Sequence, residues 1–349
     1  MMTDQTQATE ARIAALEHRL AQFEGRLAPP APRTTGTEWA ERFGLIVAWG
    51  LMILILGYFK PDQMFAWNSY ASMFGSQAMI VVLALALIIP LTTGDFDLSV
   101  ASTMGLAAMT LAVLNVQQGW GITETILVVL LIGAAVGAVN AIFVLWLGIH
   151  SLIVTLGTGY FINGLVLWIS KSATVAGVSP GLVKVVILTR FLGIPLAFWF
   201  AAVLAVIIWY AFQHTALGRR LLFVGRGREV ARLSGVNVTY VRAGALMASG
   251  TISALAGVLF AGIFGSADPS ASLSFLLPAF AAAFLGSTTL YPGRFNAPGA
   301  FVAVFFLSTG IMGLNFLGAP GFVKNLFYGG GLVVAVSISQ LIRKRRPMD

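Results

Sequence analysis

Cysteine is absent from this 349-residue chain, and charged side chains make up only 10% of it. Without cysteine the chain forms no disulfide, no thiolate metal site and no cysteine nucleophile. Soluble domains carry about 25% charged residues, so this composition excludes a soluble protein. The low charge accompanies 58% hydrophobic residues and a mean hydropathy of +0.88. Repeated apolar runs near the roughly 20 residues needed to cross a bilayer predict a polytopic membrane protein.

The usual signatures of catalysis and cofactor binding are also missing. No Gly-Lys dipeptide occurs, so there is no Walker A phosphate loop. The three histidines are scattered without ligand spacing, and no Ser/His/Asp or HExxH arrangement stands out. No intramembrane series of acids and histidines builds a proton relay. We therefore expect no enzyme, no catalytic residue, no metal site and no cofactor held by this chain.

The first 42 residues are polar and lack the basic start and apolar core of a signal peptide. Apolar side chains spaced 3-4-3-4 predict an amphipathic helix over residues 5–27. The seam covers fewer than four heptads, so both a coiled coil and a helix lying on the membrane or on its own protein stay open. Prolines within residues 28–37 predict a linker. The seam residues are Ile13, Leu16, Leu20, Phe23 and Leu27.

The apolar runs that follow predict an all-α bundle of about ten transmembrane helices. We expect three regions: residues 1–42 as the N-terminal helix and linker, 43–342 as the transmembrane domain with a loop at 213–242, and 343–349 as a basic tail. The expected spans are 43–59, 73–92, 98–115, 125–147, 152–170, 195–212, 242–263, 275–289, 298–316 and 322–341.

The distribution of basic residues predicts the orientation. Ten spans put both termini on one side, and cytoplasmic loops carry an excess of Lys and Arg. With a cytoplasmic N-terminus, the inside segments hold 16 of the 21 basic residues and the outside segments hold 4. This asymmetry explains the net charge of +8 without a nucleic-acid partner. We expect both termini in the cytoplasm.

Two joints between spans are broken rather than continuous. Residues 90–99 place a proline, a glycine, Asp95 and Asp97 between two apolar runs, and residues 290–299 form a similar break around Arg294. A carboxylate at the bilayer centre costs about 2.5–3.5 kcal/mol. The aspartates therefore either line a translocation path or pair with Arg294, or they cap the helix that starts near residue 98 or 99.

Neutral polar side chains within the spans are the other candidates for a path. They let helices pack closely and hydrogen-bond across the gap. They also suit a path for an uncharged polar solute. Together with Asp97, the candidate pathway residues are Asn140, Thr155, Thr158, Asn163 and Asn315.

The long polar segment between hydrophobic spans, residues 215–242, carries six arginines against one acid. Within it Glu229 to Gly235 has the pattern of a short helix closed by glycine. Val230 and Leu233 are three apart and share a face. We expect this helix to be the docking point of a soluble, ATP-hydrolysing partner, with its charged residues in water. The candidate coupling residues are Arg228, Glu229, Val230, Ala231, Arg232, Leu233 and Gly235.

Together these stretches resemble the permease subunit of a ribose-type ABC sugar importer, in the branched-chain amino acid/ribose-type permease family. The likeness runs from about residue 70 to 342. It is carried by five motifs in order: Thr92-Thr-Gly-Asp-Phe-Asp-Leu-Ser99, the span containing Asn140, Ile153-Val-Thr-Leu-Gly-Thr158, Glu229-Val-Ala-Arg-Leu-Ser-Gly-Val-Asn237, and Leu285-Gly-Ser-Thr-Thr-Leu-Tyr-Pro-Gly-Arg294.

The resemblance implies a multi-pass protein of the bacterial inner membrane that forms the path for a sugar or sugar-like solute. It also implies a second permease copy, as homodimer or heterodimer, an ATPase subunit that binds the ATP, and a periplasmic or lipid-anchored sugar-binding protein. An ion- or proton-coupled secondary transporter is the alternative, because broken helices suit it too. A third interpretation is a membrane scaffold that acts through its N-terminal helix.

Overall fold

The structure, a computed structural model, describes residues 35–345 and is helical over most of them. Nine helices of this described part are long and apolar enough to cross a membrane. The all-α polytopic bundle predicted from the sequence is confirmed. The long helices are α2 (Thr35–Phe59), α4 (Trp67–Thr92), α5 (Val100–Ala112) with the π-helical turn η1 (Val113–Gln117), α6 (Ile122–Leu145), α7 (Ser151–Ser170), α9 (Leu196–His214), α12 (Val238–Phe264), α14 (Ala297–Phe316) and α15 (Phe322–Arg345).

The two ends of the chain differ in part from the expected boundaries. The predicted amphipathic helix at 5–27 lies outside the described residues. Helix α2 begins at Thr35, within the expected linker, and its apolar part begins at Arg42. Helix α15 continues to Arg345, into the expected basic tail. Helical hydrogen bonding thus extends beyond each apolar stretch, because no proline interrupts it there.

The eighth expected span, 275–289, is shorter than a full crossing. It consists of the turn η3 (Ser272–Phe275) and helix α13 (Leu276–Gly286). At 1.5 Å per residue these reach about 22 Å, against a hydrocarbon thickness of about 30 Å. The chain then continues without helix until Asn296, whose side-chain amide donates to the carbonyls of Gly286 and Thr289. This side chain satisfies backbone groups that no helix satisfies.

Helix α4 lies at the centre of the bundle. In its most apolar stretch 83% of the residues are buried, and it packs against α9, α12, α13 and α14. Its sequence is apolar on all sides from Ala78 to Leu91, which is the pattern of a helix surrounded by other helices. Helix α4 therefore connects the two ends of the bundle through its core.

Helices α6 and α12 approach closely because glycines face each other across the contact. A side chain at Gly250 would collide with the carbonyl oxygen of Gly133, and one at Gly137 would collide with the backbone of Leu246. Small residues of this kind allow transmembrane helices to pack backbone to backbone. Helix α12 also packs against α4 and α5, so it forms the second core element.

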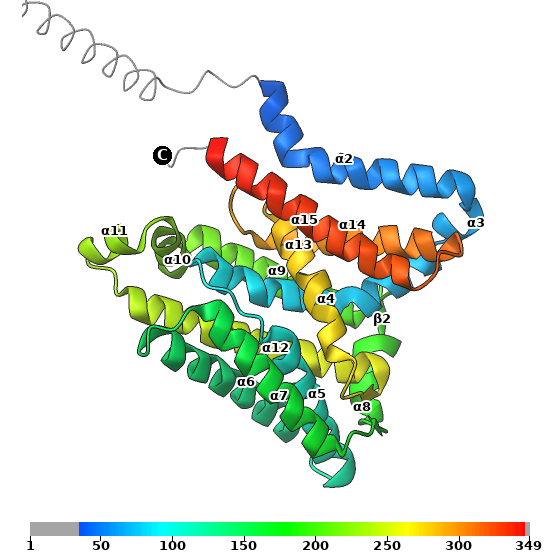
Figure 1. Ribbon diagram of the computed structural model, residues 1–349. Coiled ribbons are helices and arrows are strands. Elements are labelled where there is room, and N and C mark those ends of the chain that lie inside the picture. The colour runs from blue at the N-terminus through cyan, green and yellow to red at the C-terminus, as the bar shows by residue number, and fades with distance from the viewer. Residues whose placement is uncertain (1–34, 346–349) are drawn as a thin grey trace, which may run out of the picture. The chain divides into compact units, whose positions relative to one another are not determined.

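Short elements gather at the two ends of the long helices. Figure 1 shows α10 (Ala216–Arg226) and α11 (Arg228–Leu233) at one end, and α3 (Pro61–Met64), α8 (Pro180–Val183) and β2 (Arg190–Phe191) at the opposite end. Two small antiparallel pairs complete the fold. Strand β1 (Val175–Ala176) pairs with β4 (Ser266–Ala267), β2 pairs with β3 (Ile194–Pro195), and η2 (Lys184–Leu188) follows α8.

Candidate coupling helix, buried joint and polar cleft

The loop between α9 and α12 folds into the two short helices α10 and α11. Thr215 caps α10 by accepting a hydrogen bond from the N–H of Gly218. Gly235 adopts a left-handed conformation with φ of +81°, and its N–H donates to the carbonyl of Arg232. Glycine tolerates this conformation without the steric cost that other residues meet. The short helix predicted here, with glycine after its end, is confirmed.

Helix α11 presents two apolar side chains outward. Val230 is 59% exposed and Leu233 is 85% exposed, whereas Ala231 between them is buried. Glu229 and Arg232 form an exposed ion pair with each other at 2.7 Å. Large apolar side chains on a polar, charged loop are typical of a surface that binds another protein. The outward face of α11 therefore has the composition of a docking surface.

Arg228 keeps 42% of its side chain exposed, in line with the sequence-based expectation, but its guanidinium also contacts the end of α4. Its Nη2 donates to the carbonyls of Thr93 and Gly94 and to Oδ1 of Asp95, each at 3.1 Å. The reason is position: the first residue of α11 lies beside the end of α4, so its guanidinium reaches the joint while the side chain stays partly in solvent. Sequence spacing within α11 could not predict this contact, because the partner lies more than 130 residues earlier.

The segment between α4 and α5, residues 93–99, is the buried joint. Helix α4 contains Pro90 and ends at Thr92, and Gly94 takes a left-handed conformation with φ of +79°. The hydroxyl of Thr93 donates to the carbonyl of Pro90 and to Oδ2 of Asp95. The joint is thus held by its own side chains as well as by its neighbours.

Asp95 forms ion pairs with two arginines. Arg242 binds it through two nitrogens, with Nε at 2.7 Å from Oδ2 and Nη2 at 2.7 Å from Oδ1. Arg228 binds Oδ1 at 3.1 Å. The carboxylate side chain is only 2% exposed and that of Arg242 is 15% exposed, so their contact forms where water screens charge weakly, whereas Arg228 is 42% exposed. The sequence left open whether Asp95 lines a path, pairs with Arg294 or caps a helix, and it did not identify Arg228 or Arg242 as its partner.

Asp97 is bound by hydroxyl groups. Ser99 donates to its Oδ1 through the hydroxyl at 2.5 Å and through the backbone N–H at 3.1 Å, and Ser249 donates to Oδ2 at 2.7 Å. Burial raises the pKa of Asp97 above its ordinary value, and the hydrogen bonds from Ser99 and Ser249 oppose that rise. The structure does not place Arg294 among its partners. This bond reaches the N–H of Ser99, the residue directly before α5, and within the described chain the structure records no side-chain capping bond to the first turn of that helix.

Asn140 and Thr155 belong to the same polar cluster. The amide of Asn140 donates to the Ser99 hydroxyl at 2.9 Å, and Asn140 is fully buried. Thr155 accepts from the N–H of Leu98 at 3.0 Å, and the Ser151 hydroxyl accepts from the N–H of Phe96 at 3.0 Å. These side chains satisfy the non-helical backbone of the joint. Three candidate pathway residues, Asp97, Asn140 and Thr155, therefore lie together at the joint.

The remaining two candidates on α7 lie elsewhere. Thr158 and Asn163 are half-buried. Neither residue is among the hydrogen-bonding partners of the joint that the described part of the chain supplies. Their helix is only 22% buried in its apolar stretch. They are therefore not brought together with the other polar candidates.

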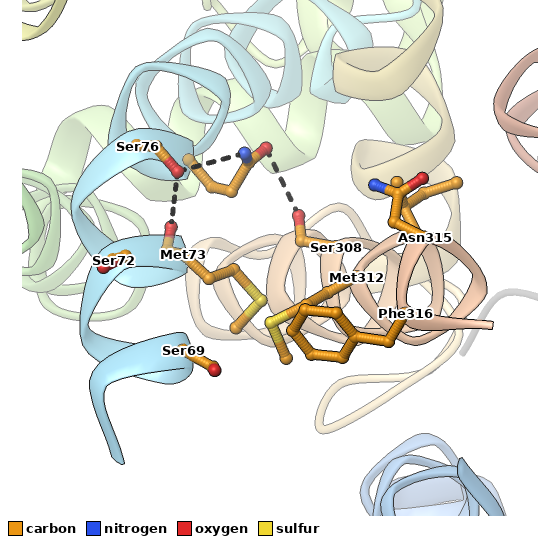
Figure 2. A pocket seen from close by; sticks show the side chains of 10 residues that line it. Ser69, Ser72, Met73, Ser76, Ser308, Met312, Asn315 and Phe316 are labelled. Carbon is orange, nitrogen blue, oxygen red and sulfur yellow. Dashed lines mark hydrogen bonds between the residues drawn. The ribbon is translucent and has the colours of Figure 1, made fainter. Parts of the chain in front are cut away.

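A cleft of about 450 Å³ opens between α4 and α14, at the end of α4 remote from the joint. Its lining includes Ser69, Ser72 and Ser76 of α4, and Figure 2 shows Ser308 and Asn315 of α14 across from that helix. The hydroxyl of Ser308 donates to the side-chain carbonyl of Gln77, whose amide donates to Ser76. The lining carries no charged residue, and Met73, Ile311, Met312 and Phe316 supply its apolar part.

The sequence predicted only one residue of this cleft, Asn315. The missed residues of α4 had a readable signal, because Ser69, Ser72 and Ser76 recur at intervals of three and four, on one helical face. The expected span began at residue 73, which put the first two serines in a loop. Helix α4 in fact begins at Trp67, so all three lie on it.

Comparison with known proteins gives one matching family and several relatives. The family described as "Branched-chain amino acid transport system / permease component" matches residues 69–336. The D-allose transport system permease protein of Escherichia coli (strain K12) is 27% identical over 87% of this chain and 93% of its own. The autoinducer 2 import system permease protein of Photorhabdus laumondii is 31% identical over 86% and 91%. Its counterpart in Salmonella typhimurium is 32% identical over 74% and 79%. No solved structure matches.

Proposed function

Because this chain belongs to the family of branched-chain amino acid transport system permease components, we propose that it is the permease subunit of an ATP-binding cassette importer. In this role it forms the membrane path for a sugar or sugar-like solute. ATP is bound and hydrolysed by a separate subunit, since this sequence contains no Walker A loop. The permease itself catalyses no covalent reaction.

The observation that carries this proposal is the outward face of α11. Val230 and Leu233 are the exposed apolar residues of a short, charged helix at one end of the bundle. Apolar side chains at the centre of a contact usually supply most of its binding energy. A groove on a soluble ATPase would bury both of them, with Glu229 and Arg232 at the rim. A secondary transporter has no need for such a surface.

The polar cleft supports a neutral, hydroxyl-bearing solute. Its serine, glutamine and asparagine side chains both donate and accept hydrogen bonds, and its apolar residues suit the carbon face of a sugar ring. Relatives named for D-allose and for autoinducer 2 are consistent with this class of solute. We assign the cleft to the outer half of the path, with α10 and α11 on the cytoplasmic side.

The remaining parts of the importer follow from the same proposal. A second permease copy, identical or related, completes the path across the inner membrane. A periplasmic or lipid-anchored binding protein delivers the solute to the end that carries α3, α8 and β2. The positive charge of the 215–242 segment supports a cytoplasmic location for the coupling helix.

Uptake into proteoliposomes tests the proposal, with the permease, its ATPase and its binding protein reconstituted and D-allose and autoinducer 2 as first probes. We expect uptake that requires ATP and continues when proton and sodium gradients are collapsed. Uptake that follows a pH or sodium gradient without any ATPase would instead identify a secondary transporter.

A further inference from the structure

Asp95 connects three segments that are far apart in the sequence. Its carboxylate lies in the buried joint, and its two arginine partners come from the first residue of α11 and the first turns of α12. Arg242 makes the two-pronged contact that gives the strongest guanidinium–carboxylate geometry. Arg228 makes one contact to Asp95 and two to neighbouring carbonyls. One carboxylate thus holds α11 and α12 to the joint.

The joint is placed to receive a displacement of α11. The end of α10 touches the end of α4 so closely that a side chain at Gly225 would collide with the carbonyl oxygen of Thr92. The guanidinium of Arg228, whose side chain is 42% exposed, hydrogen-bonds to the joint, and Val230 and Leu233 of the same helix are 59% and 85% exposed. A partner that moves the outer face of α11 therefore moves Arg228, and with it the joint.

Burial strengthens the Asp95–Arg242 contact. Asp95 is 2% exposed and Arg242 is 15% exposed at the side chain, whereas Arg228 is 42% exposed. Removing one member of a buried ion pair leaves an uncompensated charge, which is strongly unfavourable. The Glu229–Arg232 pair on the same helix is 74% and 70% exposed and joins α11 only to itself. Of these ion pairs, only those of Asp95 link α11 to the core.

Helix α4 leads directly from the joint to the polar cleft. It ends at Thr92 beside Asp95, and Ser69, Ser72 and Ser76 at its other end line the cleft. Helix α4 is continuous from the cleft to the joint and buried over most of its apolar stretch, so a displacement at one end carries to the other. We infer that Asp95, bound to Arg228 and Arg242, is the positioning residue through which α11 drives the opening and closing of the cleft. This inference rests on the proposed importer function.

The test uses the full permease bound to its ATPase and needs no knowledge of the solute. The chain contains no cysteine, so Ser76→Cys places a single labelling site in the cleft. Its labelling rate by a membrane-impermeant maleimide is measured with and without ATP and orthovanadate. Binding of the ATPase to the permease is measured separately. Arg228→Gln is the main variant, because the Asp95–Arg242 contact remains to support folding.

We expect Arg228→Gln to bind the ATPase as tightly as wild type. Its nucleotide-dependent change in labelling rate should fall about fivefold or more, within the range of typical coupling between sites. Arg226→Gln is the matched control, since Arg226 is exposed in the same loop, and should keep the full change. Asp95→Asn should lose the change and Asp95→Glu, which keeps the charge, should retain most of it.

Three results would overturn the inference. If Arg228→Gln kept the full nucleotide-dependent change in labelling rate, the Arg228–Asp95 contact would not transmit the displacement of α11 to the cleft. Weaker ATPase binding by Arg228→Gln would make Arg228 a docking residue instead. If the wild-type permease itself neither binds the ATPase nor responds to nucleotide, the proposed importer function fails and the inference fails with it.

Discussion

Asp97 is a fully buried carboxyl group whose hydrogen-bond donors are Ser99 and Ser249. The nearest charged cluster is the Asp95 ion pair, two residues earlier in the same joint. Burial raises the pKa of Asp97, so its carboxyl group binds a proton more tightly in the folded protein than in the unfolded chain. A raised carboxyl pKa stabilises the fold at low pH, and this contribution is lost as pH rises from about 4 through the raised value.

The variant Asp97→Asn, which cannot ionise, should therefore gain thermal stability relative to wild type as the pH increases from 5 to 8. Each kcal/mol corresponds to roughly 2–4 °C in melting temperature. The exposed Asp62 supplies the matched control Asp62→Asn, for which we expect a smaller change. Melting curves of the purified permease give the result. A difference between Asp97→Asn and wild type that shrinks with rising pH would contradict this role of burial.

Asn315 offers its amide to the cleft from α14. We expect Asn315→Ala to raise the solute concentration for half-maximal uptake about two- to tenfold, because one neutral hydrogen bond contributes about 0.5–1.5 kcal/mol. Asn68→Ala is the control, since Asn68 is exposed near the start of α4 and does not line the cleft. Uptake assays over a solute titration measure both. Equal values for Asn315→Ala and wild type would remove Asn315 from the path.

At the scale of the element, α11 was predictable because its signals are local. The spacing of Val230 and Leu233 and the position of Gly235 lie within one short stretch. The ion pairs of Asp95 were not predictable, because Arg242 is 147 residues away and the packing of α12 against α4 and α5 brings it near. Local periodicity identifies elements, whereas long-range packing chooses the partners of buried charges.

Leu233→Asp should abolish the stimulation of ATP hydrolysis while the permease still inserts into the membrane. A side chain at the centre of a contact often contributes 2 kcal/mol or more, so ATPase binding should weaken about 30-fold. Leu217→Asp on α10 is the matched control, because Leu217 is 67% exposed in the same loop. Binding and stimulated hydrolysis are measured with reconstituted components. Normal stimulation in Leu233→Asp would exclude α11 as the docking surface.

At the scale of the whole molecule, the sequence predicted ten apolar segments, and the described residues contain nine long helices plus the short stretch Ser272–Gly286. Hydropathy identifies apolar segments, but it does not predict the residue at which a helix within such a segment ends. The polar cleft was mostly missed for a related reason. Ser69 and Ser72 look like loop residues until the start of α4 is known.

The cysteine-free chain also allows a direct test of orientation. Leu192→Cys in the turn between β2 and β3 and Leu233→Cys in α11 are exposed and lie at opposite ends of the bundle. We expect an impermeant maleimide to label Leu192→Cys in spheroplasts and Leu233→Cys only after the membrane is broken. The cysteine-free chain without either substitution is the negative control for labelling. The reverse pattern would place α11 outside and contradict the positive-inside assignment.

Asn296 has a mechanical consequence for the permease as a whole. Its amide donates to carbonyls of Gly286, Thr289 and Arg294, and its oxygen accepts from the N–H of Gly299. One side chain thereby joins the end of α13 to the start of α14. Widening the cleft at Asn315 requires α14 to move away from α4. Because Asn296 links the two helices, α13 moves with α14. Helices α13 and α14 therefore move as one unit relative to α4.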